Sequence, residues 1–159
     1  MLEESPLTAE DVMTRDVKVV HPETPLLTAV RIMADHHISG LVVVDDQDRP
    51  VGMLTEGDLL RWHGEFTERQ AWWLEHLSEG TDLAPNFLGA IRSQQRRVKK
   101  LMTEGTITVF PETSTREIAR LFYERNIKRV PVVKDDKLVG LVSRGDLLRA
   151  LADELSKAS

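Results

Sequence analysis

The stretch Thr55-Glu-Gly-Asp58-Leu-Leu-Arg61 returns near the other end of the chain as Ser143-Arg-Gly-Asp146-Leu-Leu-Arg149. Further pairs align in the same order: Met13-Thr14 with Met102-Thr103, Pro22-Glu-Thr24 with Pro111-Glu-Thr113, and Val43-Val44 with Val132-Val133. Repetition of this length indicates one supersecondary unit written twice, in which each copy buries its apolar face against the other. The sequence therefore predicts two structural repeats that fold together.

The composition is that of an ordinary soluble protein, with 159 residues of which 41% are hydrophobic and 30% charged. The absence of cysteine removes disulfides, thiol nucleophiles and thiolate metal sites. A net charge of −5 argues against binding to a nucleic-acid backbone. Apolar runs such as Leu41–Val44 are too short to span a bilayer, and the first residues lack the features of an export signal. We expect a cytoplasmic protein that does not bind membranes.

Each repeat shows the signals of a strand, a helix, two strands and a closing helix. Strands are predicted at 17–20, 41–44, 51–54, 130–133 and 139–142. Thr24 is predicted to cap a helix with Pro25 at its first position and Leu26, Val30 and Met33 facing inward. Ser114 and Glu117 form a capping box for the matching helix. Its inward residues are Ile118, Leu121 and Phe122, and the last helix carries Leu147, Leu148, Leu151 and Leu155.

These motifs resemble the CBS domain, of which a tandem pair is called a Bateman module. The marks are Met-Thr before the first strand, Val-Pro-Val-Val, the turn that ends in Val-Gly, and Ser/Thr-x-Gly-Asp-Leu-Leu. The resemblance implies an α/β (α+β) fold with two β-α-β-β-α repeats related by a pseudo-twofold axis, here 8–62 and 99–155 with an insert at 63–98. It also implies clefts between the repeats that often bind adenosine derivatives, and a regulatory function without catalysis.

The second repeat carries the more complete set of candidate ligand contacts. Asp146 can accept from both ribose hydroxyls, Ser143 can bond to ribose or phosphate, and the amides that open the helix suit an anion. Arg129 occupies the place where the family often has a phosphate-binding basic residue. The run Val130-Pro131-Val132 could border an adenine through side chains or backbone. A plain helix-capping role for Ser143 and Asp146 is compatible with ligand binding and equally expected.

The two predicted sites differ in charge. Thr55 and Asp58 repeat the ribose-binding pair, but Gly40 stands where the second repeat has Arg129. In the family each cleft also uses the segment that leads into the opposite repeat. The resemblance therefore adds Thr14 and Lys18 to the Ser143 site, and it adds Ile107 to the Thr55 site in place of that lysine. The first repeat is expected to hold a less charged ligand or none.

The insert contains a predicted helix with Trp72 and Trp73, which resembles the insert of bacterial CBS-pair proteins that often carry a BON domain. No BON domain is expected in this chain. The tryptophans either pack on their own chain, which is favoured, or cover a partner. The basic run from Arg92 to Lys100 is interpreted as a solvated helix face, with a phosphate or nucleic-acid contact as the minority interpretation.

The sequence therefore predicts a regulatory module that senses AMP, ADP or ATP and signals its occupancy to a partner protein, as a homodimer. No catalytic triad, phosphate-cradling glycine loop or metal cluster is present in the sequence, so neither an enzyme nor a required metal is expected. S-adenosylmethionine remains an open alternative ligand. The second hypothesis is a ligand-independent dimerisation or protein-interaction module, in which Asp58 and Asp146 only cap helices.

Overall fold

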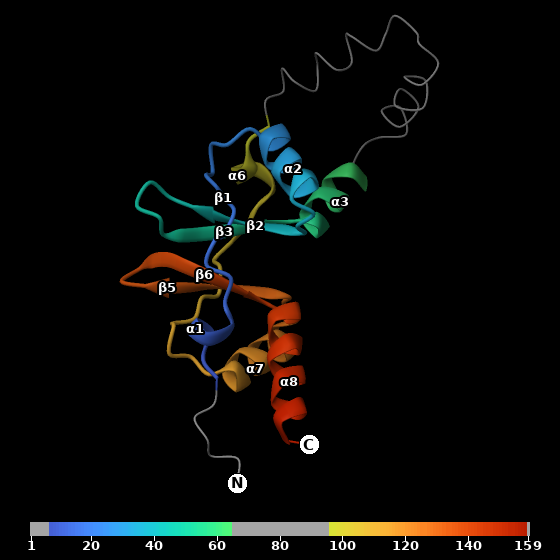
Figure 1. Ribbon diagram of the computed structural model, residues 1–159. Coiled ribbons are helices and arrows are strands. Elements are labelled where there is room, and N and C mark those ends of the chain that lie inside the picture. The colour runs from blue at the N-terminus through green and yellow to red at the C-terminus, as the bar shows by residue number, and fades with distance from the viewer. Residues whose placement is uncertain (1–6, 65–95, 159) are drawn as a thin grey trace, which may run out of the picture. The chain divides into compact units, whose positions relative to one another are not determined.

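The computed structural model describes residues 7–64 and 96–158, and the chain divides into two units (Figure 1). Of the described residues, the first unit contains 7–19, 44–52 and 104–158, and the second contains 20–43, 53–64 and 96–103. These units do not coincide with the sequence repeats. Each unit consists mainly of one repeat together with the segment that leads into the opposite repeat.

The first unit is built around an antiparallel hairpin. Its elements are α1 (Ala9–Val12), α7 (Thr115–Arg125), β5 (Arg129–Lys134), β6 (Lys137–Ser143) and α8 (Arg144–Ala158). The two-residue turn uses Asp135 and Asp136, with φ of 52° and 66°. Positive φ at both positions is the geometry of a type I′ turn, whose twist matches that of the two strands. The predicted order of helix, two strands and closing helix is confirmed here.

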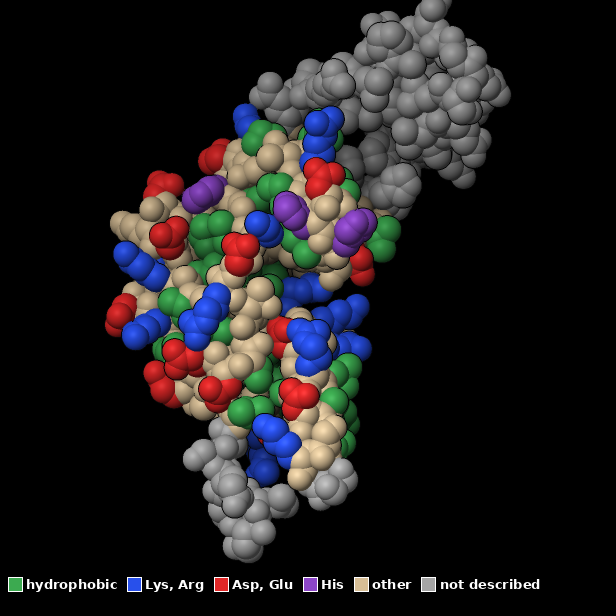
Figure 2. All heavy atoms as spheres, in the orientation of Figure 1, with side chains coloured by type: hydrophobic (Ala, Val, Ile, Leu, Met, Phe, Trp, Pro, Cys, Tyr) green, Lys and Arg blue, Asp and Glu red, His purple; other side chains and the backbone are tan. Residues whose placement is uncertain are grey.

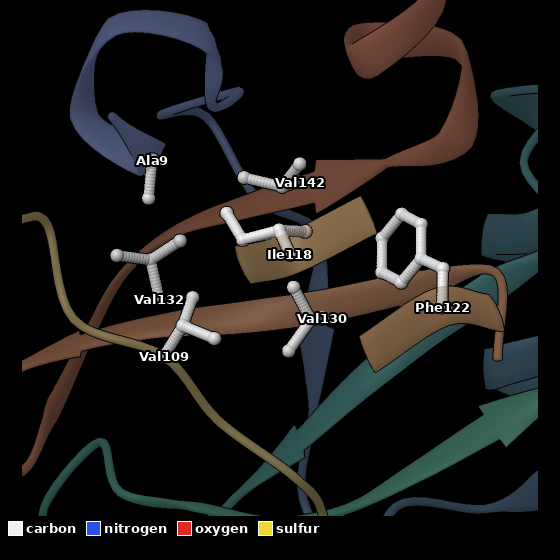
Figure 3. Packing of buried hydrophobic residues seen from close by; sticks show 7 residues of the cluster. All are labelled: Ala9, Val109, Ile118, Phe122, Val130, Val132 and Val142. Atoms are coloured by element: carbon white, nitrogen blue, oxygen red, sulfur yellow. The ribbon is translucent and has the colours of Figure 1, made fainter. Parts of the chain in front are cut away.

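The core of this unit lies between the helices α1 and α7 and the hairpin of β5 and β6 (Figure 3). The buried cluster comprises Ala9 from α1, Val109, Ile118 and Phe122 from α7, Val130 and Val132 from β5, and Val142 from β6. Alternate residues of a strand point to one face, so Val130 and Val132 enter the same core. Ala9, although it lies at the start of the first repeat in sequence, is completely buried in the core that the second repeat forms.

The second unit centres on a four-stranded sheet of order β1-β2-β3-β4. Its strands are β1 (Val19–Val20), β2 (Gly40–Val44), β3 (Pro50–Thr55) and β4 (Thr103–Glu104), a few end residues of which belong to the first unit. The helices are α2 (Leu26–Asp35), α3 (Glu56–Gly64) and α6 (Val98–Leu101). Strand β2 is buried along its whole length, as expected for a continuous apolar run. The first strand is shorter than the predicted range 17–20.

The start of α2 differs from the prediction. Thr24 does not cap this helix, because its hydroxyl accepts the backbone N–H of His21 at 2.9 Å. Pro25 lies at the N-cap position, and the N–H of Leu26 instead donates to the carbonyl of Arg96 at 2.8 Å. A backbone carbonyl from a distant segment thus satisfies a helix-end donor that usually takes a side-chain cap. In α7 the predicted cap is confirmed, since the Ser114 side chain accepts from the N–H of Glu117 at 3.1 Å.

The inward face of α2 also differs by one position. Leu26 and Met33 are buried as predicted, but the third buried residue is Ala29, and Val30 is only half-buried. In α7 both Ile118 and Phe122 are buried. Helical neighbours three and four positions apart share a face, so 26, 29 and 33 form a consistent stripe.

The two short helices α1 and α6 dock in the same way on opposite repeats. The N–H of Ala9 donates to the carbonyl of Thr113 at 2.7 Å, and the N–H of Val98 donates to the carbonyl of Thr24 at 2.9 Å. The N–H of the next residue in each helix donates to the proline carbonyl of the same Pro-Glu-Thr tripeptide. These bonds are Glu10 to Pro111 at 3.0 Å and Lys99 to Pro22 at 2.9 Å. The repeated tripeptide therefore serves as the docking site for the segment that leads into the other repeat.

Candidate functional site

The junction between β6 and α8 forms a closed arrangement of side chains. Asp146 Oδ2 accepts the backbone N–H of Ser143 at 2.8 Å and its hydroxyl at 3.0 Å. The N–H of Asp146 donates back to Ser143 Oγ at 3.2 Å. This is the reciprocal geometry of a capping box, and it holds a carboxylate at the start of a helix, where the helix dipole favours negative charge. Asp146 is 6% exposed.

Arg149 completes this arrangement from the next turn of α8. Its Nη2 forms an ion pair with Asp146 Oδ1. The guanidinium folds back toward the start of the helix and lies close to Gly145. A Cβ built on Gly145 would be 3.5 Å from Arg149 Nη1, and it would be 3.7 Å from Ser143 Oγ. Residues three apart on a helix are neighbours, so this pairing follows from the sequence spacing. Sequence reasoning missed Arg149, although the Asp-Leu-Leu-Arg motif carries the signal.

The neighbouring strand brings the other predicted residues of the second repeat to this junction. Arg129 lies directly opposite Ser143 in the register of β5 and β6, and Val130 lies opposite Val142. Val130 and Val132 are completely buried and pack into the core cluster, while the intervening Pro131 is also buried. Any contact of these valines with a ligand would therefore come from their backbone, one of the two alternatives that the sequence left open.

The N-terminal segment that contains Met13 and Thr14 pairs with the hairpin of β5 and β6. The N–H of Thr14 donates to the carbonyl of Leu141 at 2.9 Å, and the N–H of Leu141 returns to the carbonyl of Thr14 at 3.0 Å. Met13 packs so closely on Gly140 that an added Cβ would lie 2.8 Å from Met13 Cγ. Lys18 belongs to this unit as well, with its Nζ 3.7 Å from Asp16 Oδ2.

The first repeat builds the matching junction between β3 and α3. Asp58 Oδ2 accepts the N–H of Thr55 at 2.9 Å and its hydroxyl at 3.1 Å. Asp58 Oδ1 accepts the hydroxyl of Thr103 at 3.3 Å, a contact that sequence reasoning missed. Asp58 is 4% exposed. Gly40 begins β2, and Ile107 packs against the core cluster of the first unit.

The basic run before the second repeat holds α6 to the first repeat. Lys99 Nζ lies 2.7 Å from Glu23 Oε1, and Arg97 Nη1 donates to the backbone carbonyl of Glu23 at 3.2 Å. The hydrogen bond from Lys99, together with its charge, lowers the pKa of Glu23 from its usual 4.5. These two side chains are therefore intramolecular contacts and not only a solvated face. Arg92 and the predicted helix with Trp72 and Trp73 lie outside the described residues.

The described residues contain no cluster of three or more His, Asp and Glu side chains placed to hold a metal ion. Among the same residues, no helix is both long and apolar enough to cross a bilayer.

A family model for the CBS domain matches residues 9–65 and 98–153. The chain belongs to the CBS domain family. The two matched ranges correspond to the repeats, and each includes one of the two Ser/Thr-x-x-Asp junctions. The predicted tandem CBS fold is thereby confirmed.

Three relatives of this CBS pair span different lengths. The structure of CBSX2, an Arabidopsis thaliana protein, in complex with AMP is 29% identical with a TM-score of 0.69, and the match covers 92% of this chain and 97% of that chain. Hypoxic response protein 1 of Mycobacterium tuberculosis is 29% identical, over 92% of this chain and 86% of the relative. The Methanocaldococcus jannaschii protein MJ1404 is 33% identical over 89% of this chain, but the match spans only 31% of that longer relative.

Proposed function

We propose that this CBS pair is a regulatory module that binds an adenosine nucleotide, AMP, ADP or ATP, at the Ser143–Asp146 junction and signals its occupancy to a partner protein. The observation that carries the proposal is a buried carboxylate fixed at the start of α8, directly opposite a strand that begins with Arg129. The complex of the similar protein CBSX2 with AMP supports the choice of ligand.

The chemistry of the junction suits a nucleoside phosphate. Ribose hydroxyls donate to carboxylate oxygens, and Asp146 presents an oxygen that is not engaged by Ser143. The positive end of the α8 dipole suits a phosphate, which the charge of Arg129 also complements. Lys18, carried on the segment that pairs with β6, is a second candidate for a phosphate contact.

The Thr55–Asp58 junction is proposed to bind phosphorylated ligands more weakly. It repeats the carboxylate and hydroxyl, but Gly40 stands at the start of β2, where the second repeat has Arg129 at the start of β5. In addition, the hydroxyl of Thr103 already donates to the Asp58 oxygen that faces away from Thr55. Both features reduce what this junction offers to a charged ligand.

The signalling surface is proposed to be the outer face of α8, where a second copy of the chain packs to form a homodimer. Hydrophobic side chains gather along the outer edge of this helix (Figure 2). Leu148, Leu151 and Leu155 are all exposed, as is Tyr123 on α7. Leu148 and Arg149 line one groove together with Leu151. A change in the position of the Arg149 side chain on ligand binding would thus reach the surface on which the second copy of the chain packs.

Calorimetric titration with AMP, ADP, ATP and S-adenosylmethionine tests the ligand. We expect binding of at least one adenosine phosphate, and a weakening of about 10-fold or more in Asp146→Asn, which keeps the shape of the side chain but removes the charge. The matched variant Asp58→Asn should retain the tighter site. Absence of binding at millimolar nucleotide would reject the proposal, as would loss of the tighter site in Asp58→Asn alone.

A ligand-independent interaction module is the second candidate function. It is favoured by the exposed leucines of α8 and by the fact that Asp146 already has partners in Ser143 and Arg149. Under this alternative, the titrations above give no heat, while the chain still self-associates through α8.

A further inference from the structure

The position of Arg149 is unusual for a surface arginine. Its side chain is 71% exposed, but its end returns to a carboxylate that is only 5% exposed. The Nη1 atom also lies above Gly145, where a larger residue would come into contact with the guanidinium. Two observations therefore place this cation at the first turn of α8: the ion pair with Asp146 and the approach to Gly145.

This position creates competition for Asp146. Oδ2 already accepts two donors from Ser143, so Oδ1 is the oxygen that remains for other partners. Arg149 occupies Oδ1 in the structure. A carboxylate oxygen has two lone pairs in its plane, and a ribose diol needs two acceptor positions. A diol that approaches Asp146 must therefore displace the guanidinium or share the oxygen with it.

We propose that Arg149 is a specificity-determining residue that releases Asp146 to the ribose and then binds the phosphate of the same ligand. The inference rests on the proposed nucleotide function and assigns its preference for phosphorylated nucleosides to one side chain. The guanidinium lies beside the first turn of α8, where the positive end of the helix dipole favours a phosphate. Arginine also matches a phosphate with paired N–H donors.

The two effects of Arg149 have opposite signs for different ligands. For an unphosphorylated nucleoside, Arg149 is only a competitor for Asp146. An ion pair this exposed is weak, so its removal should strengthen nucleoside binding by less than about fivefold. For a nucleotide, its removal also deletes a charged hydrogen bond, which corresponds to a loss of about 10- to 100-fold in affinity. The ratio of AMP affinity to adenosine affinity isolates the proposed role.

The experiment is calorimetric titration of the full chain with adenosine and with AMP, in the wild type and in Arg149→Ala. Lys157→Ala is the matched control, because it removes the same charge from an exposed position near the other end of α8. We expect the ratio of AMP to adenosine affinity to fall at least fivefold in Arg149→Ala and to stay within twofold in Lys157→Ala. Adenosine affinity itself should be unchanged or higher in Arg149→Ala.

A fall of less than fivefold in Arg149→Ala overturns the inference, even if Asp146 is required for binding. Equal weakening of both ligands does so too, because it assigns Arg149 a purely structural role. If Arg149→Ala does not fold, Arg149→Gln gives the same comparison with a side chain of similar length and no charge. Failure of the wild type to bind any of AMP, ADP and ATP rejects the proposed function, and the inference with it.

Discussion

Replacement of Asp146 by alanine should destabilise the protein without ligand by about 2–5 kcal/mol, because the buried carboxylate organises the start of α8. The variant leaves the half-buried N–H of Ser143 without its 2.8 Å partner, which costs about 1.5–3 kcal/mol for a charged acceptor. The lost hydroxyl bond adds about 0.5–1 kcal/mol. The ion pair with Arg149 adds at most about 1 kcal/mol, because the guanidinium is 71% exposed.

Thermal and urea unfolding without ligand measure this cost, which corresponds to a fall in Tm of roughly 4–20 °C for a chain of this size. Asp153→Ala is the control, since it removes an exposed carboxylate from the same helix and should cost less than about 0.5 kcal/mol. Ser143→Ala should cost about 1 kcal/mol. The double variant should be more stable than the sum of the two losses predicts, because the residues share their bonds. A cost below about 1 kcal/mol for Asp146→Ala, or strict additivity, would refute the capping account.

Two further predictions concern assembly and pH. In light scattering at micromolar concentration the chain should be a dimer, and Leu148→Lys with Leu151→Lys should yield 18.0 kDa monomers that remain folded; an unchanged mass would exclude this face. The lowered pKa of Glu23 means that its ion pair with Lys99 stabilises the fold above the usual Glu pKa of 4.5 and is lost as pH falls through the lowered value. The stability difference between wild type and Glu23→Gln should therefore shrink between pH 7 and pH 3, and should depend less on pH in a Lys99→Met background, where only the smaller effect of Arg97 on the pKa of Glu23 remains.

Local patterns in the sequence were sufficient for most elements of the fold. Helix α8 begins directly after Ser143 and α7 is capped by Ser114, because capping depends on residues three positions apart. The prediction for Thr24 failed for the opposite reason. The N-terminal end of α2 is completed by the carbonyl of Arg96, a partner about seventy positions away that no local pattern announces.

The contacts of the candidate site also divide into local ones, which the sequence predicts, and distant ones, which it does not. The pairs Ser143–Asp146 and Thr55–Asp58 could be predicted because each is a short motif at the end of an apolar strand. The bond from Thr103 to Asp58 spans 45 positions and depends on how β4 joins the sheet. The sequence also could not predict that the Val130 side chain faces the core. Val130 belongs to a continuous apolar run, in which the residues on both faces of the strand are alike.

The exchanged docking of α1 and α6 bears on how such a chain could arise by duplication. A polypeptide with one repeat would carry both the short helix and the Pro-Glu-Thr tripeptide, but here the short helix at the start of each repeat donates to the tripeptide of the other. Such an ancestor would satisfy these bonds by lending its helix to a second copy and receiving one in return, as in domain-swapped dimers. Gene fusion would then turn these bonds between two molecules into bonds within one chain. Each half of the chain would depend on the other half for the partner of its short helix.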